Sequence, residues 1–384
     1  MGPRWAWAAY IRRVKSTRHG LVIGKFYPPH EGHHLLISTA AALCERVSVL
    51  VLSHEVESIP HQMRVGWLRR IHAHESNVTF HGVIDDHPVN FEDAAIWDLH
   101  EAVFRAGVAA ITDEPVTAVF SSEAYGPELA RRLNAVNVPV DPGRGLAPVS
   151  GTAIRADPVA HWHRLAPPVR GWFAKRVVIV GAESTGKTTL ATDLAEALRP
   201  RGGAYGLTRW VPEYGRDFTV VKLAADRAAA VLSGERPPEV ENSKWRSEEF
   251  VTIAERQNAI EDEAAEQGGP VLFCDTDALA TAIWHERYIG ARSTEVEALA
   301  REHPLYLLTH HEDVPFSPDA VRDGEGIRAW MTGRFEERLR ETGRRFVTLR
   351  GDRHQRMAQG LQAIDMLLDE GWSMADPLLP DPTP

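Results

Sequence analysis

A glycine-rich segment, residues 181–188, has the composition of a phosphate-binding loop. It reads Gly-Ala-Glu-Ser-Thr-Gly-Lys-Thr and fits G-x-x-x-x-G-K-[ST] at every position, between an apolar run and a helical pattern. Backbone N–H groups are expected to face nucleotide phosphates, with Lys187 on the β- and γ-phosphates and Thr188 on Mg²⁺. A glycine turn that only packs a strand on a helix is the alternative. The predicted phosphate contacts are Gly181, Glu183, Ser184, Thr185, Gly186, Lys187, Thr188 and Thr189.

A carboxylate must stand beside such a loop, either to hold Mg²⁺ or to accept the proton of the attacking hydroxyl. Asp275 ends the apolar run 271–274 and is the first candidate for both roles. Asp277 would then face the hydroxyls of the acceptor, or cap the helix that is expected to begin near residue 278. Glu213 follows a short strand-like stretch and is a second candidate base or substrate ligand. The sequence does not choose between Asp275 and Glu213.

Phosphoryl transfer also needs cations over the transferred group and exclusion of water. Arg322 and Arg328 flank residues 323–326, a charged stretch that contains two glycines. This stretch is predicted to form either a lid or a solvated loop.

Two histidines stand three residues apart at the expected start of a helix in the first half of the chain. Residues 24–33 read Gly-Lys-Phe-Tyr-Pro-Pro-His-Glu-Gly-His, so His30 and His33 share one face. Such a pair can donate hydrogen bonds to a phosphate and stabilise the charge that builds up during attack on an α-phosphorus. Gly24 and Gly32 would let the phosphate come close to the backbone.

The same segment matches H-E-x-x-H over residues 30–34, the spacing of zinc peptidases. In those enzymes both histidines lie inside a helix and converge on the metal. Here Pro28 and Pro29 stand directly before the first histidine and a glycine lies between the two. No zinc is therefore expected, and a structural pair of histidines is the remaining alternative.

The elements that must position these segments alternate between strands and helices in both halves. Strands are predicted at residues 21–26, 47–52, 78–83, 116–121, 136–140, 177–180, 271–274, 306–309 and 346–349. Helices are predicted at about 32–43, 64–74, 91–106, 128–134, 190–198, 224–232, 247–266 and 295–302. Such alternation predicts an α/β protein with two doubly wound parallel-sheet domains.

The expected domain boundaries follow shifts in composition. They are a leader at 1–19, a first domain at 20–156, a linker at 157–174, a second domain at 175–372 and a tail at 373–384. The leader is basic and contains an Arg-Arg pair, but no uninterrupted apolar core follows that pair.

The overall composition is that of an ordinary globular chain. Its 384 residues contain 43 Lys and Arg against 53 Asp and Glu, a net charge of −10, which excludes a general polyanion binder. Cys44 and Cys274 lie in separate apolar runs, so no disulfide framework is available. No apolar run approaches the roughly 20 residues of a membrane span. A cytoplasmic protein without DNA or membrane partners is expected, and the oligomeric state stays open.

The histidine segment resembles the signature G-x-F-x-P-x-H-x-G-H of the nucleotidyltransferase superfamily. Residues 149–155 resemble that family's second motif, I-S-x-T-x-[IL]-R. The resemblance implies a Rossmann-like domain in which His30 and His33 bind the phosphates of ATP and stabilise the transition state. The ATP ligands that it implies are Gly24, Lys25, Phe26, Ser150, Thr152 and Arg155. Residues 121–126 resemble the S-S-x-x-Y-G loop of nicotinamide mononucleotide (NMN) adenylyltransferases, which implies that Ser122 and Tyr125 line the substrate site.

The order of the two modules narrows the resemblance to the bifunctional NadR-type family. The second half carries E-Y-x-R, from Glu213 to Arg216, and D-T-D over residues 275–277. Over residues 20–350 the resemblance implies ribosylnicotinamide kinase joined to NMN adenylyltransferase, acting on nicotinamide riboside and NMN with ATP and Mg²⁺. Some members add an N-terminal DNA-binding domain, for which there is no room before the first strand, so repressor function is not expected.

The cationic nicotinamide ring that the resemblance implies should favour an aromatic face. Trp97 is the first candidate, with Trp67, Trp210 and Trp245 as others, and core packing is the alternative for each. Arg64 resembles a residue beside the substrate, or is an exposed helix charge. Another small substrate, such as a pantetheine phosphate or a nucleoside, stays open, as does the choice between nicotinamide and nicotinic acid.

Overall fold

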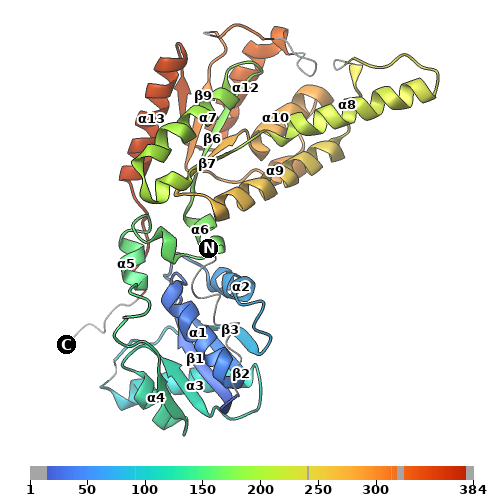
Figure 1. Cartoon of the computed structure of the whole chain (residues 1–384). Coiled ribbons are helices and arrows are strands. Elements are labelled where there is room, and N and C mark those ends of the chain that lie inside the picture. Colours follow the sequence, from blue (N-terminus) through green and yellow to red (C-terminus); the bar gives the residue numbers. More distant parts are fainter. Residues whose placement is uncertain (1–14, 91, 240–241, 313, 318–323, 378–384) are drawn as a thin grey trace. The chain divides into compact units, whose positions relative to one another are not determined.

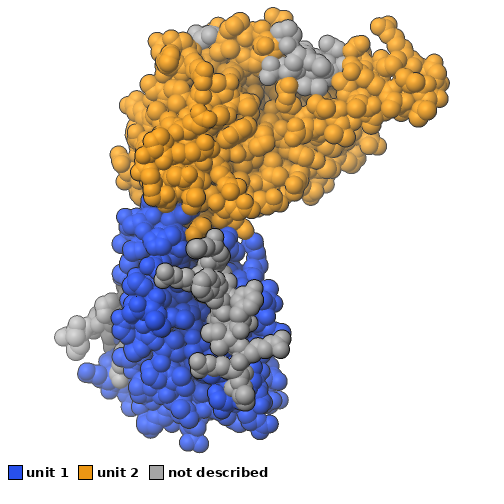
Figure 2. Space-filling view, in the orientation of Figure 1, with its two compact units in different colours: residues 1–169, 372–384 blue, residues 170–371 orange. Residues whose placement is uncertain are grey.

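The computed structural model describes residues 15–90, 92–239, 242–312, 314–317 and 324–377. The chain divides into two compact units, the first formed by residues 1–169 with 372–384 and the second by residues 170–371 (Figure 2). The division falls inside the expected linker. Residues 157–169 do not form a loose spacer, because Trp162, Leu165 and Val169 are buried. The chain returns to the first unit at residue 372, one residue before the expected tail.

The first unit contains one parallel sheet in the order β3-β2-β1-β4-β5. Its elements are β1 (Thr17–Gly24), α1 (Glu31–Leu43), β2 (Cys44–Ser53), α2 (His61–Ile71), β3 (Val78–Ile84), α3 (Ala94–Ala109), β4 (Ala118–Ser121), α4 (Gly126–Arg132), β5 (Val136–Pro139), α5 (Gly151–Ala156) and the short η2 (Trp162–Arg164) (Figure 1). The strand order reverses between β1 and β4, and ligands of open α/β sheets bind at such a switch point.

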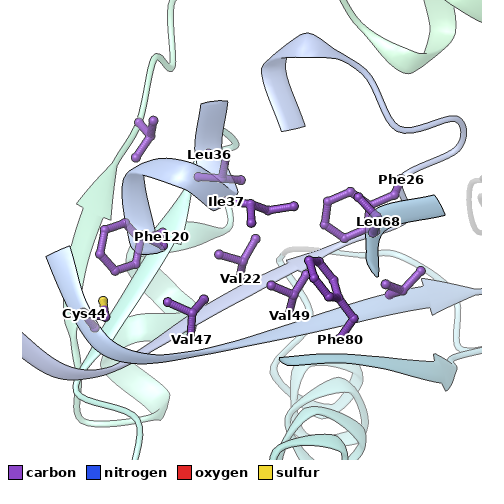
Figure 3. Packing of buried hydrophobic residues seen from close by; sticks show 14 of the residues in the cluster. Val22, Phe26, Leu36, Ile37, Cys44, Val47, Val49, Leu68, Phe80 and Phe120 are labelled. Atoms are coloured by element: carbon purple, nitrogen blue, oxygen red, sulfur yellow. The ribbon is translucent and has the colours of Figure 1, made fainter. Parts of the chain in front are cut away.

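Two apolar clusters cover the two faces of this sheet. Successive side chains of a strand point to opposite faces, so Val22 of β1 packs with α1 and α2, whereas its neighbours Leu21 and Ile23 pack on the other side. Figure 3 shows the first cluster, in which Ile37 and Leu68 lie over the strands. A sheet buried on both faces is what the unbroken apolar runs predicted.

The second unit repeats this architecture with the strand order β10-β9-β6-β8-β7. Its elements are α6 (Pro167–Phe173), whose start lies in the first unit, β6 (Lys175–Gly181), α7 (Lys187–Leu198), η3 (Arg199–Arg201), η4 (Gly203–Leu207), β7 (Arg209–Val211), α8 (Tyr214–Leu232), α9 (Ser247–Gln267), β8 (Val271–Asp275), α10 (Ala278–Ile289), α11 (Thr294–Ala298), β9 (Leu305–Thr309), η6 (Glu325–Ile327), α12 (Arg328–Glu341), β10 (Phe346–Leu349) and α13 (Arg353–Asp369). The predicted fold class, two parallel α/β domains, is confirmed.

Some boundaries differ from the sequence-based expectation. β1 begins at Thr17, inside the expected leader, because this end of the strand pairs with β2 and Thr17 shares a hydrogen bond with Thr117. α8 begins ten residues earlier than predicted; Val220 and Val221 on its first turns are exposed, so they form no buried apolar stripe. Among the described residues, no helix has both the length and the apolar character required to cross a bilayer.

Candidate functional site

The histidine segment of the first unit connects the end of β1 to the start of α1. Helix α1 begins at Glu31, and His30 is its N-cap residue with extended backbone (φ −148°). His34 lies inside the helix and its Nδ1 is 3.0 Å from Nε2 of His72. The two histidines of H-E-x-x-H therefore do not share a helix interior, so the local geometry is not that of a zinc peptidase.

His30 and His33 lie against each other at the start of α1. Their ring centroids are 3.7 Å apart at an interplanar angle of 26°, and Phe26 packs edge-on to His33 at 4.8 Å. Burial lowers the pKa of His30 well below its usual value and that of His33 to about 3, with the positive charge of Arg144 adding to both shifts. Both rings are thus neutral near pH 7, and each has one N–H to donate.

The second motif contacts the histidine segment, although about 120 residues separate them in sequence. Arg155 donates to the carbonyl oxygen of Tyr27 at 2.8 Å and to Oγ1 of Thr152 at 3.2 Å. A Cβ at Gly151 would lie 3.0 Å from the same carbonyl oxygen, so glycine at this position favours the close approach of the two loops. Ser150 accepts from the backbone N–H of Ala153 and caps α5.

Lys25 belongs to a buried charge network. Glu57 accepts from Nζ of Lys25 at 3.0 Å and from Arg64 at 2.6 Å, and Arg64 also donates to the carbonyl oxygen of Lys25 at 2.6 Å. The Arg64 side chain is fully buried, so its interpretation as an exposed helix charge is wrong. Glu57 lies in the loop after β2 and belongs to no motif, which is why sequence reasoning missed it.

The three residues expected at the NMN site have different surroundings. Tyr125 donates to the carbonyl oxygen of Ile23 at 2.9 Å, next to the end of β1, and Ser122 donates to that of Val140. Trp97 lies in the core with Ile23 and Phe104. The residue is 5% exposed, so the core alternative describes it and the expected role in stacking on nicotinamide is not supported.

The phosphate-binding loop of the second unit connects β6 to α7. Gly181 has φ +148°, and a Cβ there would lie 2.7 Å from the carbonyl oxygen of Thr309. Gly186, the residue before α7, has φ +86°. Both conformations favour glycine, which accounts for the two fixed glycines of the motif. Lys187 is the first residue of α7, and its Nζ donates to the carbonyl oxygen of Ala182 at 3.0 Å.

Buried cations hold the outside of this loop. Arg328 donates to the carbonyl oxygens of Val314 at 2.8 Å, His311 at 3.1 Å and, within the loop, Ser184 at 3.4 Å, so it is a buried residue at the start of α12 and not a solvated one. Arg356 donates to the carbonyl oxygen of Thr185 at 2.9 Å and has no motif around it that could have predicted this role. Arg322 lies outside the described residues.

The predicted carboxylates are placed differently from one another. Asp275 ends β8 and accepts a hydrogen bond from Oγ1 of Thr188. Asp277, expected to face the acceptor, instead caps α10: it accepts from the N–H of Ala280 at 3.0 Å and from the hydroxyl of Tyr306 at 2.7 Å. Both oxygens are engaged and 1% of the residue is exposed, so its surroundings are those of the alternative role as a helix cap.

Glu213 lies beside the loop as the N-cap residue of α8, but its side chain makes no capping hydrogen bond. Burial raises the pKa of its carboxyl group to about 7; Lys187 opposes this shift, and Asp275 and Glu183 add to it. Glu183 itself accepts from the N–H of Gly324 at 2.7 Å. A carboxyl group with a pKa near neutrality beside a phosphate site is suited to general-base chemistry.

A cavity of about 350 Å³ opens beside the phosphate-binding loop. Its polar lining includes residues 183–189, Glu213, Arg216 and Asp275. An aromatic wall, defined here as Trp245, Phe250, Trp284 and Tyr288, lines another part of it, with the Trp245 and Tyr288 ring centroids 5.2 Å apart. Of this wall only Trp245 was considered from sequence, because the others belong to helices whose apolar positions look like ordinary core.

The fold and these geometries define a class of protein in which a nucleotidyltransferase-like domain with paired histidines is joined to a P-loop kinase-like domain. Residues 176–356 match the family described as AAA domain. The chain is 27% identical over 353 residues to "Trifunctional NAD biosynthesis/regulator protein NadR" of Salmonella typhimurium (strain LT2), covering 88% of this chain and 80% of that protein. The chain is a homologue of the NadR proteins.

Two solved structures share the fold of the whole chain. The crystal structure of NadR protein in complex with NR superposes with a TM-score of 0.67 at 20% identity and covers 95% of this chain and 100% of that one. The crystal structure of NadR protein in complex with NAD and AMP-PNP gives a TM-score of 0.66 at 20% identity, covering 94% of this chain and 100% of that one.

Proposed function

We propose that this chain is a bifunctional enzyme of NAD biosynthesis. The second unit transfers the γ-phosphoryl group of ATP to the 5′-hydroxyl of nicotinamide riboside, giving NMN and ADP. The first unit joins NMN to the adenylyl group of another ATP, giving NAD and pyrophosphate. The observation that carries this proposal is the presence, in one chain homologous to NadR, of a paired-histidine site and of a phosphate-binding loop that opens on an aromatic-walled cavity.

In the kinase reaction, the loop and Lys187 hold the phosphates of ATP while Glu213 accepts the proton of the attacking hydroxyl. Thr188 and Asp275 supply hydroxyl and carboxylate oxygens, the donor type that Mg²⁺ prefers, and are assigned to hold it. Bound Mg²⁺ neutralises charge on the β- and γ-phosphates. The aromatic wall offers π faces to the nicotinamide cation.

In the adenylyl transfer, a phosphate oxygen of NMN attacks the α-phosphorus and pyrophosphate leaves in line. His30 and His33 each donate an N–H to the developing charge, which in a buried site is worth more than in water. Arg155 donates a hydrogen bond to the carbonyl oxygen of Tyr27, in the same segment as the two histidines. It is assigned to bind the β- and γ-phosphates. Neither reaction requires a covalent enzyme intermediate.

Product analysis tests both assignments. The purified chain is incubated with ATP and Mg²⁺, first with nicotinamide riboside and then with NMN. NAD from both substrates is the expected result. NAD from NMN alone would show that the kinase has another acceptor, such as a nucleoside, and NAD from neither would contradict the substrate class.

The chain is further proposed to act in the cytoplasm. Cys44 and Cys274 are both buried free thiols, which accords with a reducing compartment.

A further inference from the structure

A cluster of three metal-ligating side chains lies in the first unit, outside the residues assigned above to either reaction. Asp85 directly follows β3, His87 stands two positions later and His100 lies on α3. One ligand atom from each lies within 4.8 Å of the others. The Asp85 side chain is 5% exposed, whereas the His100 and His87 side chains are 14% and 36% exposed. The cluster is therefore buried at Asp85 and open to solvent at His87.

The hydrogen bonds of His100 constrain what lies between it and Asp85. Its Nε2 is 3.0 Å from the carbonyl oxygen of Pro88, and a carbonyl only accepts, so Nε2 carries the hydrogen of the neutral ring. Nδ1 then presents a lone pair to Oδ2 of Asp85 at 2.7 Å. Two lone pairs at this distance repel each other. As it stands the contact is satisfied by a second proton on the ring; once the two atoms separate slightly, a metal ion bound by both of them satisfies it equally well.

The surroundings are those of a metal ligand. Histidines that bind metals usually donate their other N–H to a backbone carbonyl or carboxylate, as His100 does to Pro88. Two imidazole nitrogens and one carboxylate form a donor set that zinc and related ions accept, and three protein ligands leave a position for water. Tetrahedral zinc places its ligand atoms about 3.4 Å apart. Both Nδ1 atoms now lie 2.7–2.8 Å from the carboxylate oxygens, so a small opening of the cluster admits the ion.

We propose that Asp85, His87 and His100 bind one divalent transition metal ion, with zinc as the representative ion. The ligands are a carboxylate oxygen of Asp85 and Nδ1 of each histidine. The ion ties the segment after β3 to α3 and is separate from the Mg²⁺ of the transfer reactions. The proposal does not depend on the reactions assigned above.

The test is calorimetric titration of the metal-free full chain with ZnCl₂ in the presence of excess Mg²⁺, together with the visible absorption spectrum of the Co²⁺-loaded protein. The wild-type chain is expected to bind one equivalent of Zn²⁺ that His87→Ala and His100→Ala lose. Loss of a ligand should weaken this binding by more than the roughly 10–100-fold that loss of an outer partner costs. The same variants should lose the Co²⁺ absorption of the site.

His74→Ala is the matched control. His74 is an exposed histidine of the same unit, 3.8 Å from Glu75 and outside the cluster, so the variant should bind Zn²⁺ as the wild type does. Zinc should also raise the thermal midpoint of the wild type and of this control but not that of His87→Ala. Because the His87 side chain is exposed, its replacement should not disturb folding, so misfolding would not account for the loss of the zinc effect. A wild type that binds no Zn²⁺, or cluster variants that bind it equally well, would overturn the proposal. His100 would then carry a second proton in an ion pair with Asp85.

Discussion

Arg356 donates a hydrogen bond to the carbonyl oxygen of Thr185 at 2.9 Å, although 171 positions separate the two residues. The same guanidinium donates to the carbonyl oxygens of His310 at 2.7 Å and Gly351 at 2.8 Å. A single buried cation on α13 thereby ties the phosphate-binding loop to the ends of β9 and β10. The curvature of the loop is thus supported from its outer side by a residue in the last helix.

Arg356→Met should destabilise the second unit and weaken its use of ATP. Three carbonyls, of which that of Thr185 is buried, lose a charged donor, and bonds of this kind contribute about 1.5–3 kcal/mol each to stability when they are counted singly. Denaturant unfolding should show a loss of at least about 2 kcal/mol, and kinase assays should show a higher KM for ATP. Arg353→Met on the same helix is the control, because its pair with Asp193 is exposed and such pairs contribute at most about 1 kcal/mol. Equal losses in both variants would contradict the anchoring role.

Lys187→Ala should abolish formation of NMN from nicotinamide riboside and leave the conversion of NMN to NAD unchanged. In the proposed reaction the lysine stabilises charge on the transferred phosphoryl group, and removal of one such stabilising group costs about 10²–10³ in kcat. Chromatographic quantification of NMN and NAD measures both steps in one reaction. Loss of both activities in a folded protein would contradict two separate sites.

His33→Ala should have the opposite effect on the two steps. One N–H donor to the developing charge at the α-phosphorus is lost, so NAD formation from NMN should fall by about 10²–10³ while kinase activity persists. Because burial lowers the His33 pKa to about 3, the ring is neutral throughout the working range. Titration of His33 in the free enzyme should therefore cause no change in the kcat/KM of adenylyl transfer between pH 6 and pH 8. A pH profile of kcat/KM for the wild-type protein checks this.

Protonation of Glu213 should cause the kcat/KM of the kinase reaction to fall at acidic pH. Its carboxyl group has a raised pKa of about 7 in the folded protein, so it is protonated below that pH and cannot accept the proton of the hydroxyl. The kcat/KM for nicotinamide riboside should fall about tenfold per pH unit below 7, and Glu213→Gln should lose this pH dependence along with most of the rate. A pH dependence that persists in Glu213→Gln would transfer the role of base to Asp275.

The raised pKa of Glu213 should also make the stability of the chain fall as the pH rises. A carboxyl group whose pKa is higher in the folded than in the unfolded state stabilises the fold most below its unfolded value, near 4.3, and this contribution is lost as pH rises through about 7. Glu213→Gln should thus gain stability relative to the wild type at pH 8 but not at pH 4. Urea unfolding at the two pH values measures the difference.

Trp284→Leu should raise the KM for nicotinamide riboside with little change in kcat. Trp284 belongs to the aromatic wall, and a cation over an aromatic face contributes about 0.5–2 kcal/mol. The corresponding rise in KM is about 2- to 30-fold, measurable from initial rates at saturating ATP. An unchanged KM would show that the ring contributes only to packing.

Both phosphate-binding segments could be read from the sequence because their chemistry is local. In each, a strand, a turn and a helix start follow one another directly, so the spacing of Gly181, Gly186 and Lys187, or of His30 and His33, already sets where these residues lie relative to the helix start. The parallel sheets were predictable for a similar reason, since strands buried on both faces are continuous apolar runs.

The roles of other residues depended on contacts between distant parts of the chain. Asp275 and Asp277 stand two positions apart, yet only Asp275 meets Thr188, because Asp277 finds a helix end and the hydroxyl of Tyr306. Trp97 and Arg64 are ordinary members of helical patterns until the fold buries one in the core and the other beside Glu57. Local spacing carries no information about such partners, so these assignments were decided by the tertiary structure alone.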